Sequence, residues 1–283
     1  MPAQVASFFH APTNTWSHIV SDPATRAAAI IDPVLDFDLA TGRIWAEHAE
    51  QLLAHVRAHE LCVEWILETH AHADHLTAAQ WLKRALPNAT VGIGAGIVSV
   101  QKHFREVFAL GADFAADGSQ FDHLFADGEE FALGTLRVRV IATPGHTSDG
   151  VSYLVDDAVF VGDTLFAPEC GTGRCDFPGA NAAIQYRSIR KLYALPDSTR
   201  VFLCHDYPPE GVEPRAQTTI GAEKVGNSQL KAATTEDEYV AVRTRRDATL
   251  AAPRLLYPSL RVNIRAGQLP APNTIAATVS DNS

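Results

Sequence analysis

The amino-acid sequence predicts a mixed α+β protein. Short apolar runs with strand-like alternation are separated by turn residues, and other segments repeat apolar residues every three or four positions, as helices do. In addition, side chains that can bind a metal follow directly on four of the predicted strands. These observations together predict a globular, enzyme-sized protein whose functional groups gather where strands end.

The first third of the chain predicts three antiparallel strands followed by a helix and a buried strand. The strands are expected at 6–10, 17–20 and 27–31, because apolar runs there end in turn residues such as Asp32-Pro33. A helix is expected from about Ala46, with Ala49, Leu53 and Val56 on one face. The strand 63–67 then leads into a histidine-rich loop, 69–75.

The middle of the chain repeats this order of elements. One helix is expected from Leu76 up to Pro87, and another over 97–108 with Gly111 ending it. The strand 136–140 then runs on to His146. A hairpin over 151–155 and 158–162 delivers Asp163 at its end.

The remaining chain predicts one more helix and strand and then a C-terminal extension. Gly179 and Asn181 introduce the helix, Pro196 ends it, and the strand 200–204 leads to His205. From about residue 208 the periodicity weakens, with helices expected at 223–230 and 236–250. We expect one domain over 1–267, including this extension, and a loose tail over 268–283 that is rich in Pro, Ala, Thr and Ser.

Composition excludes several classes of partner. The net charge is −10 and no run is rich in Lys or Arg, which argues against a nucleic-acid surface. No segment approaches membrane-spanning length, and the N-terminus lacks a basic, apolar signal pattern, so we expect a cytoplasmic protein. The four cysteines are expected to be reduced thiols, and a homodimer is the default expectation for an enzyme of this size.

The segment from His70 to His75 predicts a metal site. Three histidines and one aspartate within six residues would crowd one loop at an electrostatic and desolvation cost. A bound cation offsets that cost by accepting their lone pairs. His146, Asp163 and His205 stand at the ends of other predicted strands and can converge on the same place.

The motifs together resemble the metallo-β-lactamase superfamily: His-x-His-x-Asp-His, a Gly-His, a Gly-Asp after an apolar strand, and a final His. The resemblance covers most of residues 6–210 and implies an αββα sandwich, two mixed sheets with helices outside. In hydrolases of this superfamily two metals are bound at a sheet edge. The matching positions are His70, His72 and His146 for the first metal, Asp74, His75 and His205 for the second, and Asp163 as the bridge.

Within the superfamily the sequence is most similar to the persulfide dioxygenases, which are related to glyoxalase II. The segments 69–75, 162–177 and 204–207 carry this similarity. It implies one Fe(2+) per chain, held by His70, His146 and Asp163, and the oxidation of glutathione persulfide by O2 to sulfite and glutathione. The remaining polar residues of the motifs would then hydrogen-bond the ligands without holding a second ion; they are His72, Asp74, His75 and His205.

Substrate contacts are expected from a cation and a hydroxyl, because glutathione carries carboxylates. Arg174 and Tyr207 are the candidates, and Tyr207 stands two residues after His205 as a glutathione-contacting tyrosine does in the similar glyoxalase II motif. Lys224 is a further candidate. In this chain Thr172 and Gly173 are inserted into the segment that is usual in the family. Because of this insertion the resemblance does not fix the position of Arg174.

Two other functions remain open at this stage. A thioester hydrolase of the glyoxalase II type would use the same residues to hold two Zn or Fe ions that activate a bridging water. A diiron binding or redox-sensor module is less favoured, because no glycine-rich phosphate loop follows Pro208.

Overall fold

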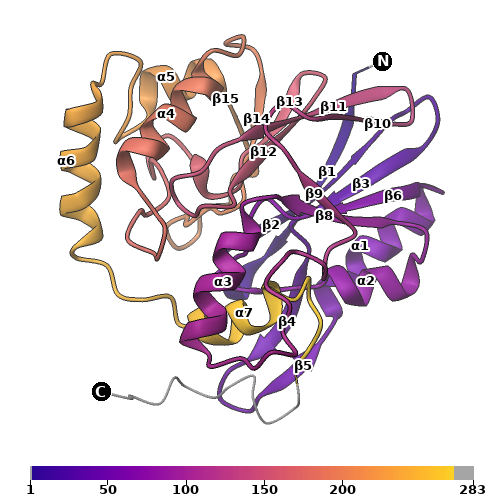
Figure 1. The fold of residues 1–283 in the computed structure, drawn as a ribbon. Helices are drawn as coiled ribbons and strands as arrows, with labels where there is room; N and C mark the ends of the chain where they lie inside the picture. Colours follow the sequence, from indigo (N-terminus) through magenta and orange to yellow (C-terminus); the bar gives the residue numbers. More distant parts are fainter. Residues whose placement is uncertain (1, 271–283) are drawn as a thin grey trace.

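Two six-stranded sheets form the centre of the molecule in a computed structural model that describes residues 2–270 (Figure 1). The first sheet has the order β1-β2-β3-β6-β8-β9, with strands Gln4–His10, Thr15–Ser21, Ala27–Ile31, Cys62–Leu67, Thr90–Gly94 and His123–Phe125. The second has the order β10-β11-β12-β13-β14-β15, with strands Glu130–Leu133, Leu136–Ala142, Val151–Val155, Ala158–Phe160, Arg200–Phe202 and Gln217–Thr219. Both sheets are mixed, since parallel pairs such as β3 with β6 and β13 with β14 join antiparallel hairpins.

The sheets pack face to face because the inner faces of their central strands are apolar. Val20 and Ile31 point inward and meet Val140 and Phe160 of the second sheet in the central core. Their neighbours along the strands, such as Ile30, point outward to the helices. Side chains alternate between the faces of a strand, so these runs bury both faces.

Helices cover the two outer faces. The first sheet is covered by α1 (Glu47–Ala58), α2 (Ala79–Ala85), α3 (Ile97–Val107) and α7 (Leu256–Asn263). The second is covered by α4 (Ala182–Tyr193), α5 (Ile220–Gly226) and α6 (Glu236–Asp247). The predicted αββα sandwich is therefore confirmed.

Several helix boundaries follow from capping side chains. Asn181, which the sequence places before a helix, accepts a hydrogen bond from the backbone N–H of Ile184 at the start of α4. Thr235 and Glu238 form a reciprocal capping box at the start of α6. Short polar side chains thus fix where these two helices begin.

The structure corrects some predicted elements. The segment Leu76–Thr77 is not the start of a helix but a short strand, β7, which pairs with β4 (Val34–Asp38). In addition, the Thr77 N–H donates to the side chain of the distant Asn263. The helix predicted at 223–230 begins at Ile220, where Thr219 caps it, and ends at Gly226. The sequence did not predict β4, β5 (Arg43–Trp45), β8 or α7. The segments that form these elements are short or have weak periodicity.

The C-terminal extension contacts both halves of the sandwich. After α6 packs beside α4, the chain crosses to the first sheet, where Leu260 and Val262 of α7 join the outer core (Figure 1). Of the predicted tail, residues 271–283 lie outside the described residues. No helix within 2–270 combines the length and the apolar character needed to cross a membrane. The four cysteines are free thiols, as predicted.

Candidate metal centre

The histidine-rich loop leaves β6 and is held from three sides by buried polar side chains. Asp32, at the end of β3, accepts hydrogen bonds from the Thr69 N–H (2.7 Å) and from the Thr69 hydroxyl (2.9 Å). Asp149 accepts from the Ala71 N–H at 2.8 Å. Asn263 of α7 donates from its side-chain amide to the carbonyls of His72 and His75, each at 2.8 Å. The loop is therefore rigid before any metal binds.

His70 has the tautomer that a metal ligand requires. The Thr69 hydroxyl gives its proton to Asp32, so it accepts from His70 Nδ1 at 3.1 Å. The lone pair of His70 is then on Nε2. Burial, followed by the neighbouring His72 and His146, lowers the pKa of His70 well below 6.5, which keeps the ring neutral.

His146 and Asp163 reach the same place from the second sheet. Each follows a glycine with positive φ: Gly145 (+142°) lies against Gln185, and Gly162 (+52°) lies against Thr69. A Cβ on either would come within 2.5 Å of these neighbours, so only glycine allows the close approach.

The His146 ring is oriented by the loop that follows Asp163. Its Nδ1 donates to the Arg174 carbonyl at 2.7 Å, and its Nε2 lies 3.4 Å from Asp163 Oδ2. Because a carbonyl only accepts, Nε2 of His146 keeps a lone pair directed toward Asp163.

The ligand atoms form two adjacent groups. His70, His146 and Asp163 have one ligand atom each within 4.8 Å of one another. The second group, with the same closeness, contains His72, Asp74, His75 and His205. The groups meet at Asp163, whose Oδ1 lies 3.3 Å from His205 Nε2. The structure thus brings together all seven residues for which the sequence predicts a place in or beside the metal site.

Several of these ligand atoms are buried without a hydrogen-bond partner among the described residues. They are His72 Nδ1, His75 Nε2, His205 Nε2 and Asp163 Oδ1. Leaving a buried polar atom unsatisfied costs on the order of 1–3 kcal/mol. Their other ring nitrogens are engaged: His72 Nε2 with Asp32 at 3.0 Å and His205 Nδ1 with the Asn14 carbonyl at 3.1 Å. The free lone pairs therefore fit a cation, so the donor set suits a metal centre.

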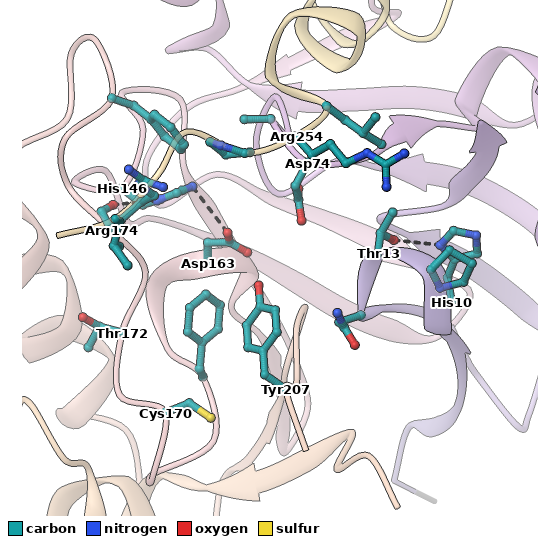
Figure 2. Close-up of a pocket in the computed structure, with 18 of the residues that line it drawn as sticks. His10, Thr13, Asp74, His146, Asp163, Cys170, Thr172, Arg174, Tyr207 and Arg254 are labelled. Atoms are coloured by element: carbon teal, nitrogen blue, oxygen red, sulfur yellow. Dashed lines mark hydrogen bonds and ion pairs between the residues drawn. The ribbon is translucent and has the colours of Figure 1, made fainter. Parts of the chain in front are cut away.

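A cavity of about 940 Å³ opens onto both groups. Its walls come from distant segments: His10 to Asn14, Phe37 to Leu39, the loop after Asp163, and the C-terminal extension (Figure 2). Phe166, Phe177 and Trp45 give it an apolar lining, and Asp74 and Asp163 face into it. A cavity of this size can hold a ligand that is much larger than dioxygen or water.

Two of the three residues predicted to bind substrate line this cavity. Tyr207 lies beside the metal group with its ring stacked on His205, at a centroid distance of 6.0 Å. Arg174 also lines the cavity, but each of its three nitrogens already donates, to both Asp176 oxygens and to the Ala251 carbonyl. Lys224, the third residue, does not line the cavity, and its ammonium pairs with Asp197 at 2.5 Å.

Two other arginines of the cavity wall have no ion-pair partner among the described residues. Arg246 of α6 and Arg254, between α6 and α7, line the cavity, and neither forms an ion pair within residues 2–270. Asp38 is the charged neighbour of Arg254; hydrogen bonds from Thr41 lower the Asp38 pKa first, and Arg254 contributes less. Sequence reasoning missed both arginines because nothing in their local pattern links them to the metal motifs, whose last residue, His205, lies 41 and 49 residues before them.

A buried ion pair supports the loop that orients His146. Arg243 of α6 is 1% exposed and donates to Asp247 Oδ1, to the Thr172 carbonyl at 2.9 Å and to Gln229 at 2.7 Å. Asp247 in turn accepts from the Cys175 N–H at 2.9 Å. The loop 172–175, including the carbonyl that fixes His146, is therefore anchored to α6.

Sequence reasoning also missed Asp32, Asp149 and Asn263, which hold the histidine loop. Asp32 had one signal, since it is an acidic residue that ends a buried strand. Asn263 had none, because its contacts are 191 and 188 residues away in the sequence.

Comparison with known proteins gives a family and several relatives. The family model described as the metallo-beta-lactamase superfamily matches residues 11–205. Glyoxylase B2 of Dictyostelium discoideum is 47% identical over 95% of this chain and 92% of its own length. A probable metallo-hydrolase of Burkholderia pseudomallei is 46% identical over 95% of this chain and 94% of its own. The mitochondrial persulfide dioxygenase ETHE1 of Bos taurus is 26% identical over 94% of this chain and 89% of its own.

Solved structures agree with the fold. ETHE1 from Myxococcus xanthus superposes with a TM-score of 0.73 at 32% identity, covering 94% of this chain and all of that one. TTHA1623, solved in a di-iron-bound form, superposes with a TM-score of 0.57 at 25% identity, covering 80% of this chain and 98% of that one.

Proposed function

The chain belongs to the metallo-β-lactamase superfamily, and from this premise we propose that it is an iron-dependent persulfide dioxygenase. Its substrate is glutathione persulfide, which it oxidises with O2 and water to sulfite and glutathione. The observation that carries this proposal is the separate group of His70, His146 and Asp163 at the cavity wall. Two histidines and one carboxylate with open positions beside them are typical of non-haem iron oxygenases.

His70, His146 and Asp163 form a complete group without His72, whose ligand atom lies within 4.8 Å of those of Asp74, His75 and His205. In a dinuclear hydrolase, His72 would share the first metal with His70 and His146, and its ring lies 4.0 Å from the His70 ring between centroids. The likeness to ETHE1 from Myxococcus xanthus, and to the bovine protein named a persulfide dioxygenase, agrees with the proposal. Iron held by the first group would supply the redox chemistry that transfers oxygen to sulfur.

The chain's own residues prepare the substrate. The apolar walls at Phe166 and Phe177 exclude water from the sulfur end of the substrate, and Tyr207 offers a hydroxyl beside the metal groups. We assign the recognition of glutathione carboxylates to Arg246 and Arg254, because Arg174 is occupied by Asp176. Arginine is suited to carboxylates through paired hydrogen bonds.

Replacing Arg246 and Arg254 together by glutamine is expected to raise KM for glutathione persulfide about tenfold or more, with iron content unchanged. The reason is that each carboxylate loses a charge-assisted hydrogen bond. The measurement is steady-state oxygen uptake with elemental analysis of the same samples. Lys224→Gln is the matched control, since that cation pairs with Asp197 outside the cavity. An unchanged KM in the double variant would remove both arginines from the substrate site.

A dinuclear metallo-hydrolase is the second candidate. The observation that favours it is the set of unsatisfied ligand atoms on His72, His75 and His205, which a second ion would satisfy. The names of the Dictyostelium and Burkholderia relatives, and the di-iron-bound form of TTHA1623, point the same way.

Metal count and substrate choice separate the two candidates. Protein supplied with iron is expected to hold about one iron per chain and to consume O2 with glutathione persulfide, without cleaving S-lactoylglutathione. His75→Ala is expected to lower turnover but keep that iron, because His75 belongs to the second group. Two metals per active chain, falling to one in His75→Ala, together with thioester cleavage, would establish the hydrolase instead.

A further inference from the structure

The N-terminal wall of the cavity contains a buried histidine that the proposed reaction does not yet use. His10 ends β1 and is only 6% exposed, yet it lines the cavity together with Thr13 of the short helix η1 (Ala11–Thr13). Figure 2 shows Thr13 between His10 and the metal-site residue Asp74. The His10 imidazole can therefore exchange a proton with a ligand in the cavity through the Thr13 hydroxyl.

Hydrogen bonds determine the tautomer of His10. Its Nε2 lies 3.3 Å from Asp36 Oδ1, and a carboxylate accepts, so Nε2 carries the proton. Its Nδ1 lies 2.7 Å from Thr13 Oγ1 and therefore accepts the hydroxyl proton. Asp36 is itself fixed, because its Oδ2 accepts from the His48 N–H at 3.0 Å. The Thr13 hydroxyl, the His10 imidazole and the Asp36 carboxylate thus follow one another in a hydrogen-bonded row. In such a row the imidazole acts as a general base and the carboxylate orients it.

The Thr13 hydroxyl is also fixed from the metal side. Thr15 Oγ1 lies 2.8 Å from Thr13 Oγ1, and 3.5 Å and 3.4 Å from the Nδ1 atoms of His75 and His205. Thr15 Oγ1 also lies 3.3 Å from the Thr13 carbonyl, so its one proton is shared between the two oxygens of Thr13. When Thr15 donates to Thr13 Oγ1, Thr13 donates to His10 and the hydroxyls form a path to the imidazole. The path is continuous from Asp36 to the edge of the metal groups.

We propose that Thr13, His10 and Asp36 form a proton-accepting relay for the reaction in the cavity. Both candidate reactions consume a water and yield an acid, so either one must release protons. The Thr13 O–H bond breaks as the His10 Nδ1–H bond forms, while Thr13 Oγ1 takes a proton from the acid in the cavity. The imidazolium charge is offset by Asp36 until the ring returns its proton to water. His10 and Thr13 are the catalytic residues, and Asp36 is a positioning residue.

The surroundings of His10 favour its neutral form at rest. Desolvation is the largest influence and lowers its pKa below 6.5, Asp36 opposes this, and His75 adds to it. His48 of α1 packs edge-on at 5.2 Å between ring centroids, and burial lowers its pKa to about 4. The His10 ring, unlike the His48 ring, also hydrogen-bonds the Asp36 carboxylate, which opposes the lowering of its pKa. His10 loses its capacity to accept a proton as the pH falls below its own pKa.

The kinetic test compares His10→Gln with Thr13→Val and Thr13→Ser in the metal-loaded protein. We expect His10→Gln and Thr13→Val to lower kcat about a hundredfold with metal content unchanged, and His10→Gln to lose the acid limb of the pH profile. Thr13→Ser, which restores the hydroxyl, should recover most of the Thr13→Val loss. His18→Gln is the control, since His18 is equally buried but bonds Ser7 and the Leu203 carbonyl away from the cavity. A kcat and pH profile within twofold of the parent in His10→Gln would overturn the relay.

A second measurement does not depend on which reaction the protein catalyses. Long-range ¹⁵N NMR of the zinc-loaded protein should show His10 as the Nε2–H tautomer, and Asp36→Asn should reduce that preference. The Nδ1–H tautomer in the parent protein would contradict the relay even if the proposed persulfide chemistry were established. If persulfide oxidation is absent, the same tautomer would still support the relay for the hydrolase.

Discussion

Asp163→Ala is expected to lose its metal and its activity together. Asp163 is the carboxylate of the group with His70 and His146; its Oδ2 lies 3.4 Å from His146 Nε2 and its Oδ1 lies 3.3 Å from His205 Nε2. Loss of a residue that merely supports a ligand reduces metal affinity or activity about 10–100-fold, and loss of the ligand itself should exceed that range. His70→Ala and His146→Ala are expected to behave in the same way.

The measurement is elemental analysis with oxygen uptake on protein whose folding is checked by circular dichroism. Asp197→Ala is a suitable control, because Asp197 is an exposed aspartate whose ion partner, Lys224, lies outside the cavity. Full metal and activity in folded Asp163→Ala would show that the ligand assignment is wrong.

Arg243→Met is expected to lower the free energy of unfolding by about 3–5 kcal/mol, the usual cost of breaking a buried ion pair on one side. Asp247 would remain buried with its charge uncompensated, and the Thr172 carbonyl would lose a donor. The variant should also bind metal more weakly, because the loop 172–175 fixes the His146 ring. Urea unfolding at constant metal concentration gives the free energy, and competition with a chelator gives the affinity.

Two comparisons make this prediction specific. Arg187→Met breaks an exposed pair between α4 and Glu236 of α6, and should change stability by no more than about 1 kcal/mol. Arg243→Met combined with Asp247→Leu removes both buried charges and should recover much of the lost stability. Equal losses in Arg243→Met and Arg187→Met would mean that the buried pair has no special role.

The sequence predicts best where local pattern and tertiary structure agree. The strands that precede His70, His146 and Asp163 carry apolar runs or alternation, so their ends could be located and the metal group anticipated. The start of α4 at Asn181 was predictable for a similar reason, since the capping side chain acts within three residues.

Other features depend on contacts that no local pattern encodes. Leu76 begins a series of apolar residues with helical spacing, yet Leu76 and Thr77 form a strand. There they pair with β4, and the Thr77 N–H donates to Asn263. Lys224 is predicted from its charge and its place in the C-terminal extension, and in the structure its ammonium pairs with Asp197. Arg246 and Arg254 line the cavity because α6 and the segment that follows it form part of the cavity wall, a long-range placement that no local pattern encodes.

The two amide hydrogen bonds from Asn263 to the histidine loop have a consequence for how the protein is made. They join residues 191 and 188 positions apart, so the loop acquires its final shape only after Asn263 has left the ribosome, long after the histidines themselves. During that interval the histidine loop lacks two of the side-chain donors that hold its backbone. A chain that stops before Asn263 should therefore hold a metal at these histidines less tightly than a chain that contains α7.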